Sequence, residues 1–267
     1  MIILLVIYFM KDITKFRNNG YQLLPGYFNE HIDNLDNITK LFIDMPEAKG
    51  KYMKYFETIN DNKVLSRMEY LIDFNEDFQR LEELVIRPIA EYYLQTPVHL
   101  FKEKINFKLP GGGAFKPHQD YPAWDDFPLE EFITIGIPLD PMTLENGCLK
   151  MARGLGKSRE IYHDKETKFI PQELSDSWDW TPIICGRGDV LVFDAFVPHY
   201  SEINKTDNNR RIYYFTYNKT REGNHRQDYF ERKREVFPQD ADKVPGKDYS
   251  KIGIKYNLGN PINTNKL

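Results

Sequence analysis

His118 and Asp120, one residue apart, together with the distant His199 constrain this chain more than any other feature of its sequence. Residues at positions i and i+2 of an extended segment point to the same side, so His118 and Asp120 can reach one ion. Two imidazoles and one carboxylate hold one face of an octahedral Fe(II) and leave three positions open for chemistry. Because His199 is far from His118 in the sequence, the fold must bring the two halves of such a site together.

The charges of this residue set also predict what else binds there. Asp120 balances one of the two positive charges of Fe(II), and the remaining charge favours an anionic chelator. A 2-oxo acid would fill two open positions, and oxygen the third. Arg210 follows the distal histidine closely, and a guanidinium is a natural partner for the carboxylate of such a cosubstrate. Arg211 is the alternative, since only one of two successive strand residues can face inward.

The pattern of apolar residues changes along the chain from helical to strand-like. The first part predicts a short helix over 10–19, a strand over 20–25 and helices over 29–45 and 67–93, the last of which Pro88 would split. From Val98 onward, short apolar runs separated by glycine and proline turns predict strands, at 101–109, 132–139, 190–193 and 211–218.

Helices followed by many short strands indicate an α+β fold. We expect a double-stranded β-helix of the jelly-roll, cupin-like type, with the N-terminal helices packed on the barrel, because this fold can hold a ligand in its mouth. We predict a single domain over 1–267, with a mainly helical part over 10–97, a jelly-roll core over 98–220 and an irregular tail over 221–267. The apolar residues 1–9 are interpreted as a possible non-native extension, with Met10 as the natural start.

Composition argues against several classes of partner. The 36 basic and 40 acidic residues give a net charge of −4 without a basic stripe, which argues against nucleic acid. The apolar start is too short to cross a membrane, which needs about 20 apolar residues, and it lacks the features of a signal peptide. The two cysteines, Cys148 and Cys185, lie in apolar surroundings without metal-ligand spacing, so we expect them to be reduced and buried in a cytoplasmic protein.

Three segments resemble the phytanoyl-CoA dioxygenase family. They are KINFKLPGGGAFKPHQD, LENGCLKMARGLGKS and GRGDVLVFDAFVPHYSEINKTDNNRR, and the opening Phe16–Tyr21 is also similar to the usual start of the family. The resemblance spans most of residues 10–220. It implies an Fe(II)- and 2-oxoglutarate-dependent oxygenase on a double-stranded β-helix, with oxygen as the third reactant and ascorbate as a possible reductant.

Matching positions imply a role for each of the site residues. His118, Asp120 and His199 would bind iron, and Arg210 would hold the distal carboxylate of 2-oxoglutarate with the help of Ser201. Two further residues on the strand before the glycine turn would contact cosubstrate or substrate, namely Lys104 and Asn106. Candidate substrate contacts are Tyr121, Trp124 and Arg67.

The resemblance also narrows the reaction. Halogenating relatives replace the carboxylate ligand with a small residue, so the presence of Asp120 favours hydroxylation of an aliphatic carbon. Gly136 stands where members that act on phytanoyl-CoA have a tryptophan, which indicates a different pocket lining. The expected substrate is a small polar or charged molecule, such as an aminophosphonate or a compatible solute, and the expected assembly is a monomer or homodimer. The alternatives are a metal- or ligand-binding module without turnover, and a zinc hydrolase that would leave Arg210 without a role.

Overall fold

A computed structural model describes residues 13–59, 61–112, 114–155, 160–164, 168–249 and 256. The chain forms two antiparallel sheets. The larger has the order β1 (Tyr21–Leu24), β9 (Val190–Asp194), β6 (Phe132–Pro138), β11 (Arg210–Lys219), β4 (Val98–Lys108), β3 (Asn62–Glu69) and β2 (Met53–Ile59). The smaller has the order β5 (Phe115–His118), β10 (His199–Ser201), β7 (Leu149–Ala152) and β8 (Trp180–Pro182).

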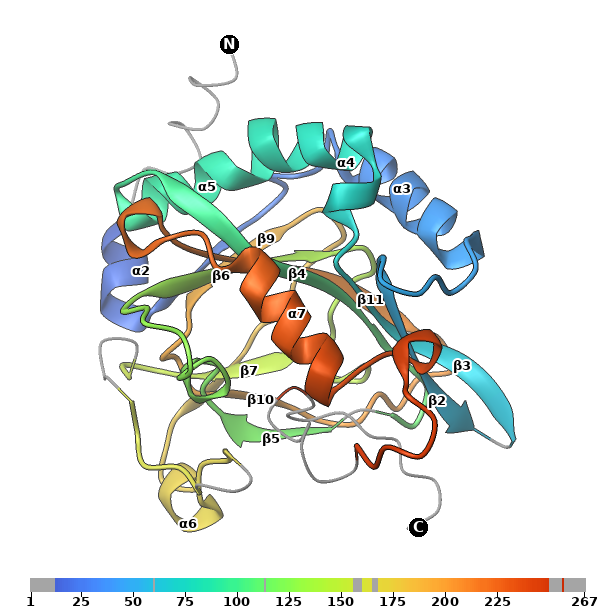
Figure 1. The fold of residues 1–267 in the computed structure, drawn as a ribbon. Coiled ribbons are helices and arrows are strands. Elements are labelled where there is room, and N and C mark those ends of the chain that lie inside the picture. The colour runs from blue at the N-terminus through green and yellow to red at the C-terminus, as the bar shows by residue number, and fades with distance from the viewer. Residues whose placement is uncertain are drawn as a thin grey trace.

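The helices within residues 13–94 cover the outer face of the larger sheet, and the smaller sheet lies on its other side (Figure 1). The helices are α2 (Ile13–Asn19), α3 (Ile32–Asp44), α4 (Glu76–Leu81), a π-helical turn (Glu82–Ile86), α5 (Arg87–Leu94), α6 (Gln172–Ser175) and α7 (Arg226–Val236). The 3-10 turns are Ile72–Phe74, Tyr121–Ala123, Thr220–Glu222 and Asp240–Asp242. Within the described residues the two sheets do not close into a barrel. The expected jelly roll is therefore confirmed as an open two-sheet sandwich.

The alternation of side chains along β11 separates the core under the helices from the space between the sheets. Tyr213 and Phe215 point outward, where both rings pack against Phe78 of α4, with ring centroids 5.6 and 6.0 Å away. The Tyr213 hydroxyl also forms a hydrogen bond of 2.9 Å with Thr39 of α3. Tyr214 points the other way and joins the apolar cluster between the two sheets. Because successive side chains of a strand point to opposite faces, one face packs against the helices and the other can line a binding site.

The N-terminal part is less helical than expected. The helix predicted over 67–93 is wrong at its start, because Arg67 lies in β3 and pairs in register with Asn106 of β4. Tertiary pairing thus overrides the local helical spacing. The helix begins at Glu76, where the side chain of Asn75 accepts a hydrogen bond from the Phe78 backbone N–H at 2.8 Å. Pro88 lies in the first turn of α5, directly after the π-helical turn, so the helix changes its hydrogen-bonding pattern before Pro88 but does not break there.

The tail was expected to be irregular, and this is wrong for α7, which lies against β4 (Figure 1). The helix is rich in charged residues, so its sequence shows little apolar periodicity. Its stability comes instead from tertiary contacts, since Tyr229 packs against Phe101 with ring centroids 4.8 Å apart. The proposed start at Met10 falls outside the described residues. Among the described helices, none is long and apolar enough to cross a membrane.

Candidate active site

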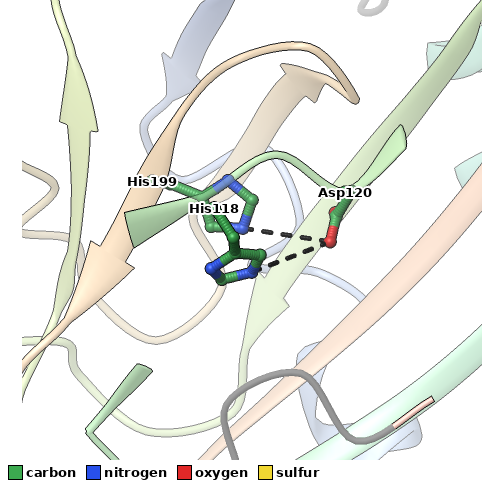
Figure 2. A group of neighbouring side chains, drawn as sticks. All are labelled: His118, Asp120 and His199. Atoms are coloured by element: carbon green, nitrogen blue, oxygen red, sulfur yellow. Dashed lines mark ion pairs between the residues drawn. The ribbon is translucent and has the colours of Figure 1, made fainter. Parts of the chain in front are cut away.

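His118, Asp120 and His199 converge at one end of the space between the sheets (Figure 2). His118 ends β5 and His199 begins β10, and the two are directly paired across these strands. The Nε2 atoms of His118 and His199 each lie 4.0 Å from Oδ1 of Asp120, and the two imidazole centroids are 4.3 Å apart. All three ligand atoms lie within 4.8 Å of one another, so one ion can contact them together.

Backbone carbonyls orient both imidazoles. Nδ1 of His118 donates to Lys116 O at 2.7 Å, and Nδ1 of His199 donates to Val197 O at 2.9 Å. This leaves the Nε2 lone pairs directed at Asp120, which is the usual way in which outer hydrogen bonds set the tautomer of a metal-binding histidine. Burial, and then repulsion from His199, lowers the pKa of His118 to about 3, so its ring is neutral. His118 is thus in the form that binds a metal.

The carboxylate of Asp120 is ionised in this setting. Burial acts to raise its pKa, but His199 and Lys102 outweigh burial, and the pKa lies below its ordinary value. A buried anion beside two imidazoles attracts a cation, and two nitrogens with one oxygen suit iron(II).

Asn204 joins the two halves of the site. Its side-chain amide donates to Lys108 O at 2.9 Å, and its backbone carbonyl accepts from Gly111 N–H at 2.8 Å. Gly111 has a φ of 71°, a conformation that glycine adopts without strain. The segment after β10 is thereby fixed to the turn that leads into β5, so the histidines are held in register.

Alternate residues of β4 present polar side chains to the pocket beside the triad. These residues are Lys102, Lys104, Asn106 and Lys108. Arg210 of β11 pairs in register with Lys108 and is 3% exposed in the same pocket. Arg211 lies on the opposite face, where it binds Asp140 at 2.8 Å and Asp36 at 2.7 Å. Of the two adjacent arginines, only Arg210 enters the pocket.

Lys108 is a pocket residue that the sequence interpretation missed. Its Nζ donates to Ser201 Oγ at 2.8 Å and to Gly147 O at 3.0 Å. Burial, and then repulsion from Arg210, lowers its pKa to about 6. Its position in the sequence could have identified it, because Lys108 is two residues from Asn106 and four from Lys104, and this spacing places all three side chains on one face of a strand. Arg210 and Lys108 side by side make this end of the pocket suited to a carboxylate, which would favour the charged form of Lys108.

The candidate substrate residues separate into two groups. Trp124 and Arg67 line the pocket, and both are buried. Tyr121 does not line it, since its ring stacks on Phe196 with centroids 4.4 Å apart and lies in a different depression. Polar or aromatic lining residues that the sequence interpretation did not assign to this pocket include Glu69, Lys102, Thr134, Thr216, Tyr229, Lys233 and Tyr256. Both cysteines are unpaired and buried, as expected.

Comparisons with known proteins agree with this geometry. Residues 16–212 match the family model described as phytanoyl-CoA dioxygenase (PhyH). A 2-aminoethylphosphonate dioxygenase from the uncultured bacterium HF130_AEPn_1 is 40% identical over 254 residues, which cover 93% of this chain and 96% of that protein. A methylphosphonate hydroxylase from Gimesia maris is 35% identical over 246 residues, 91% of this chain and 93% of that protein. The crystal structure of the epimerase SnoN in complex with Fe3+, alpha ketoglutarate and nogalamycin RO superposes with a TM-score of 0.65 at 18% identity, over 91% and 93% of the two chains.

Proposed function

Because this chain belongs to the phytanoyl-CoA dioxygenase family of iron(II)- and 2-oxoglutarate-dependent dioxygenases, we propose that it hydroxylates an aliphatic carbon of a small organophosphonate. The observation that carries the proposal is the convergence of His118, Asp120 and His199 with the buried Arg210–Lys108 pair in one pocket. Two relatives that cover nearly the whole chain are named for phosphonate substrates, and this selects the substrate class.

In this proposal the triad holds iron(II) on one face. Both imidazoles are oriented by backbone carbonyls, the His118 ring is neutral, and Asp120 supplies the single negative charge. Iron(II), when bound, supplies the redox chemistry that couples oxygen to 2-oxoglutarate and to the substrate. The carboxylate of Asp120 occupies the place that a halide would need, so hydroxylation is the expected outcome.

Arg210 and Lys108 would bind the distal carboxylate of 2-oxoglutarate, with Ser201 as a further donor. Ser201 already contacts Lys108 at 2.8 Å, so the hydroxyl and ammonium act as one cluster. Within the described residues, Nε of Arg210 is buried without a hydrogen-bond acceptor, and its Nη1 contacts only the weak acceptor Sδ of Met142, at 2.9 Å. A bound carboxylate would satisfy these donors, which are otherwise costly to bury. Lys104 and Asn106 lie next along the strand in the same pocket and would contact cosubstrate or substrate.

The overall reaction balances as one 2-oxoglutarate, one oxygen molecule and one C–H bond giving succinate, carbon dioxide and one C–OH. One oxygen atom enters succinate and the other enters the product, so no further reductant is consumed in a coupled turnover. Ascorbate would only return an oxidised iron to iron(II). The buried aromatic wall of the pocket, including Trp124 and Phe193, excludes water from this reaction.

The test is formation of succinate together with a hydroxylated product, using iron(II), ascorbate, 2-oxoglutarate and oxygen. Methylphosphonate, 2-aminoethylphosphonate and a phosphorus-free compatible solute are compared as substrates, with His199→Ala as the control. We expect equal amounts of succinate and hydroxylated phosphonate from the unaltered protein, and neither from His199→Ala. Turnover of the compatible solute alone would refute the phosphonate assignment. Activity with Zn(II) in the absence of oxygen would indicate a hydrolase, and metal binding without any turnover would indicate a binding module.

The small-molecule substrate is the only partner proposed for this pocket. The absence of nucleic-acid and membrane partners, a cytoplasmic location, a monomeric or homodimeric state and a single-domain organisation stay predictions.

A further inference from the structure

The pocket extends beyond the part of the chain that the family shares. The family match ends at residue 212, whereas Tyr229 and Lys233 of α7 and the later Tyr256 line the pocket. Lys233 forms a buried ion pair with Glu69 of β3, and Arg67 donates to the backbone carbonyl of Tyr256 at 3.2 Å. The segment after residue 212 therefore closes one end of the pocket with residues that lie outside the match to the family model.

Lys102 and Lys104 bring two ammonium groups to this end of the pocket. Lys102 is buried with Nζ 4.3 Å from the centroid of the Trp124 ring, and Nζ of Lys104 lies 5.4 Å from that of Tyr214. In the part of the chain that the structure describes, neither ammonium has a hydrogen bond or an ion pair within 4 Å. Ring faces compensate a buried cation only in part, so the buried Lys102 lacks the anionic partner that burial of a charge requires, and the half-buried Lys104 lacks one as well.

The acidic residues nearby are already engaged. The carboxylate of Glu69 is shared between Lys233, its ion-pair partner, and Arg67, whose Nε lies 3.4 Å away. Burial acts to raise the pKa of Glu69, but attraction to Lys233 and Arg67 lowers it to about 2, so it is fully ionised in these pairs. Asp120 belongs to the metal triad. Four basic side chains, Lys102, Lys104, Arg67 and Lys233, therefore share the single carboxylate of Glu69 at this end once Asp120 is assigned to the metal. Burial lowers the pKa of Lys102 and of Lys104, and a bound dianion would favour the charged form of both.

We propose that Lys102 and Lys104, with Arg67 beside them, form a dianion subsite that binds the phosphonate group of the substrate. This inference rests on the proposed function and adds the residues that select for phosphonate. A phosphonate carries up to two negative charges and three acceptor oxygens, whereas a sulfonate or carboxylate carries one charge. Both lysines line the same pocket as His118, Asp120 and His199, so we expect the carbon bonded to phosphorus to be the one presented for hydroxylation.

The subsite is distinct from the cosubstrate end. Lys104 and Lys108 are four residues apart on one strand, about 13 Å at 3.3 Å per residue. The Arg210–Lys108 pair can thus hold a dicarboxylate while Lys102 and Lys104 hold a second anion. The lack of an unshared carboxylate at the subsite also means that an amino group on the substrate has no dedicated acceptor among the described residues. We therefore expect alkylphosphonates with and without an amino group to be bound.

The first experiment measures KM for phosphonate and for 2-oxoglutarate separately in Lys102→Met and Lys104→Met. Loss of a charged contact in a desolvated site should raise KM for methylphosphonate roughly tenfold or more, with KM for 2-oxoglutarate changed less than about twofold. Lys104→Arg retains the charge and should recover part of the loss. Lys63→Met is the matched control, because Lys63 lies on the neighbouring β3 but pairs at the surface with Glu47 and Asp240. Unchanged phosphonate KM, or a rise confined to 2-oxoglutarate, would overturn the proposal.

The second experiment does not depend on turnover. Calorimetric titration of the unaltered protein compares methylphosphonate with methanesulfonate, which has the same shape and one charge less. We expect the phosphonate to bind at least about tenfold more tightly, with the preference lost in Lys102→Met and Lys104→Met. Equal affinities would overturn the subsite. Lysine-dependent phosphonate binding without hydroxylation would instead refute the proposed function, while phosphonate hydroxylation that the lysine variants leave intact would refute only the subsite.

Discussion

Arg210 and Arg211 are adjacent in the sequence but point to opposite faces of β11. Arg210 enters the pocket beside Lys108, and Arg211 forms ion pairs with Asp140 and Asp36 under the N-terminal helices. The register of β11 therefore places two adjacent arginines in different environments, one in the pocket and one under the helices. Arg210 is placed to bind a ligand, and Arg211 holds α3 against the sheet through Asp36.

The two arginines should respond differently to the same substitution. Arg210→Met should raise KM for 2-oxoglutarate by roughly tenfold to a hundredfold, since it removes a desolvated partner of a carboxylate. Arg211→Met should leave that KM nearly unchanged and lower the melting temperature, because Asp140 and Asp36 lose their partner. Steady-state kinetics and thermal denaturation of both variants check this, and the reverse pattern would assign the cosubstrate to Arg211.

The candidate metal ligands could be predicted from the sequence, but the choice between these two arginines could not. The spacing of His118 and Asp120 predicted that both side chains could reach one ion, and the strand run after Arg210 predicted that only one arginine faces inward. The sequence interpretation could not choose between them, because register depends on pairing with β4. The role of Lys233 could not be predicted from the sequence at all. Its helix has weak apolar periodicity, and only the tertiary contact with Glu69 gives the residue a role.

Removing the charge of Asp120 should weaken metal binding. Asp120→Asn keeps a side-chain oxygen but loses the only anion among the three ligands, so we expect the affinity for iron(II) to fall by at least about tenfold. Anaerobic titration with iron(II) in the presence of 2-oxoglutarate measures the change. Asp125→Asn, which alters a nearby acid outside the triad that pairs with Lys168, is the matched control. Equal affinity in the two variants would remove Asp120 from the ligand set.

Binding of 2-oxoglutarate should be accompanied by uptake of a proton. Burial and Arg210 hold the pKa of Lys108 at about 6 in the free protein, so at pH 7.5 this lysine is mostly neutral. A bound carboxylate favours the charged form and raises the pKa, which draws a proton from solvent. Calorimetry at pH 7.5 in two buffers with different ionisation enthalpies should show uptake that disappears at pH 5, where Lys108 is already protonated. The same uptake in Lys108→Met would assign the proton to another group.

Gly147→Ala should destabilise the protein and disturb Lys108. Gly147 has a φ of 68°, and a Cβ there would lie 2.3 Å from Glu202 O and 2.7 Å from Lys108 Nζ. Strain and the clash together predict a loss of about 1–3 kcal/mol or more in the free energy of unfolding. Chemical denaturation measures it, and Gly154→Ala is the control, since Gly154 has a φ of 76° but open space around it. Equal losses in both variants would mean that backbone strain alone accounts for the effect.

Asp194→Asn should make the stability of the protein less dependent on pH. Burial raises the pKa of Asp194 to about 7 in the folded state, whereas an unfolded aspartate titrates near 3.9. The contribution of Asp194 to stability is therefore fully present below about pH 4 and is lost as the pH rises through 7. Asparagine cannot ionise, and its side-chain oxygen can still accept the Phe196 N–H, which now donates to Oδ1 at 2.7 Å. Denaturation at a series of pH values should show the variant more stable than the unaltered protein at pH 8, with a difference that shrinks toward pH 4. A difference that stays constant over this range would show that Asp194 does not carry the buried charge.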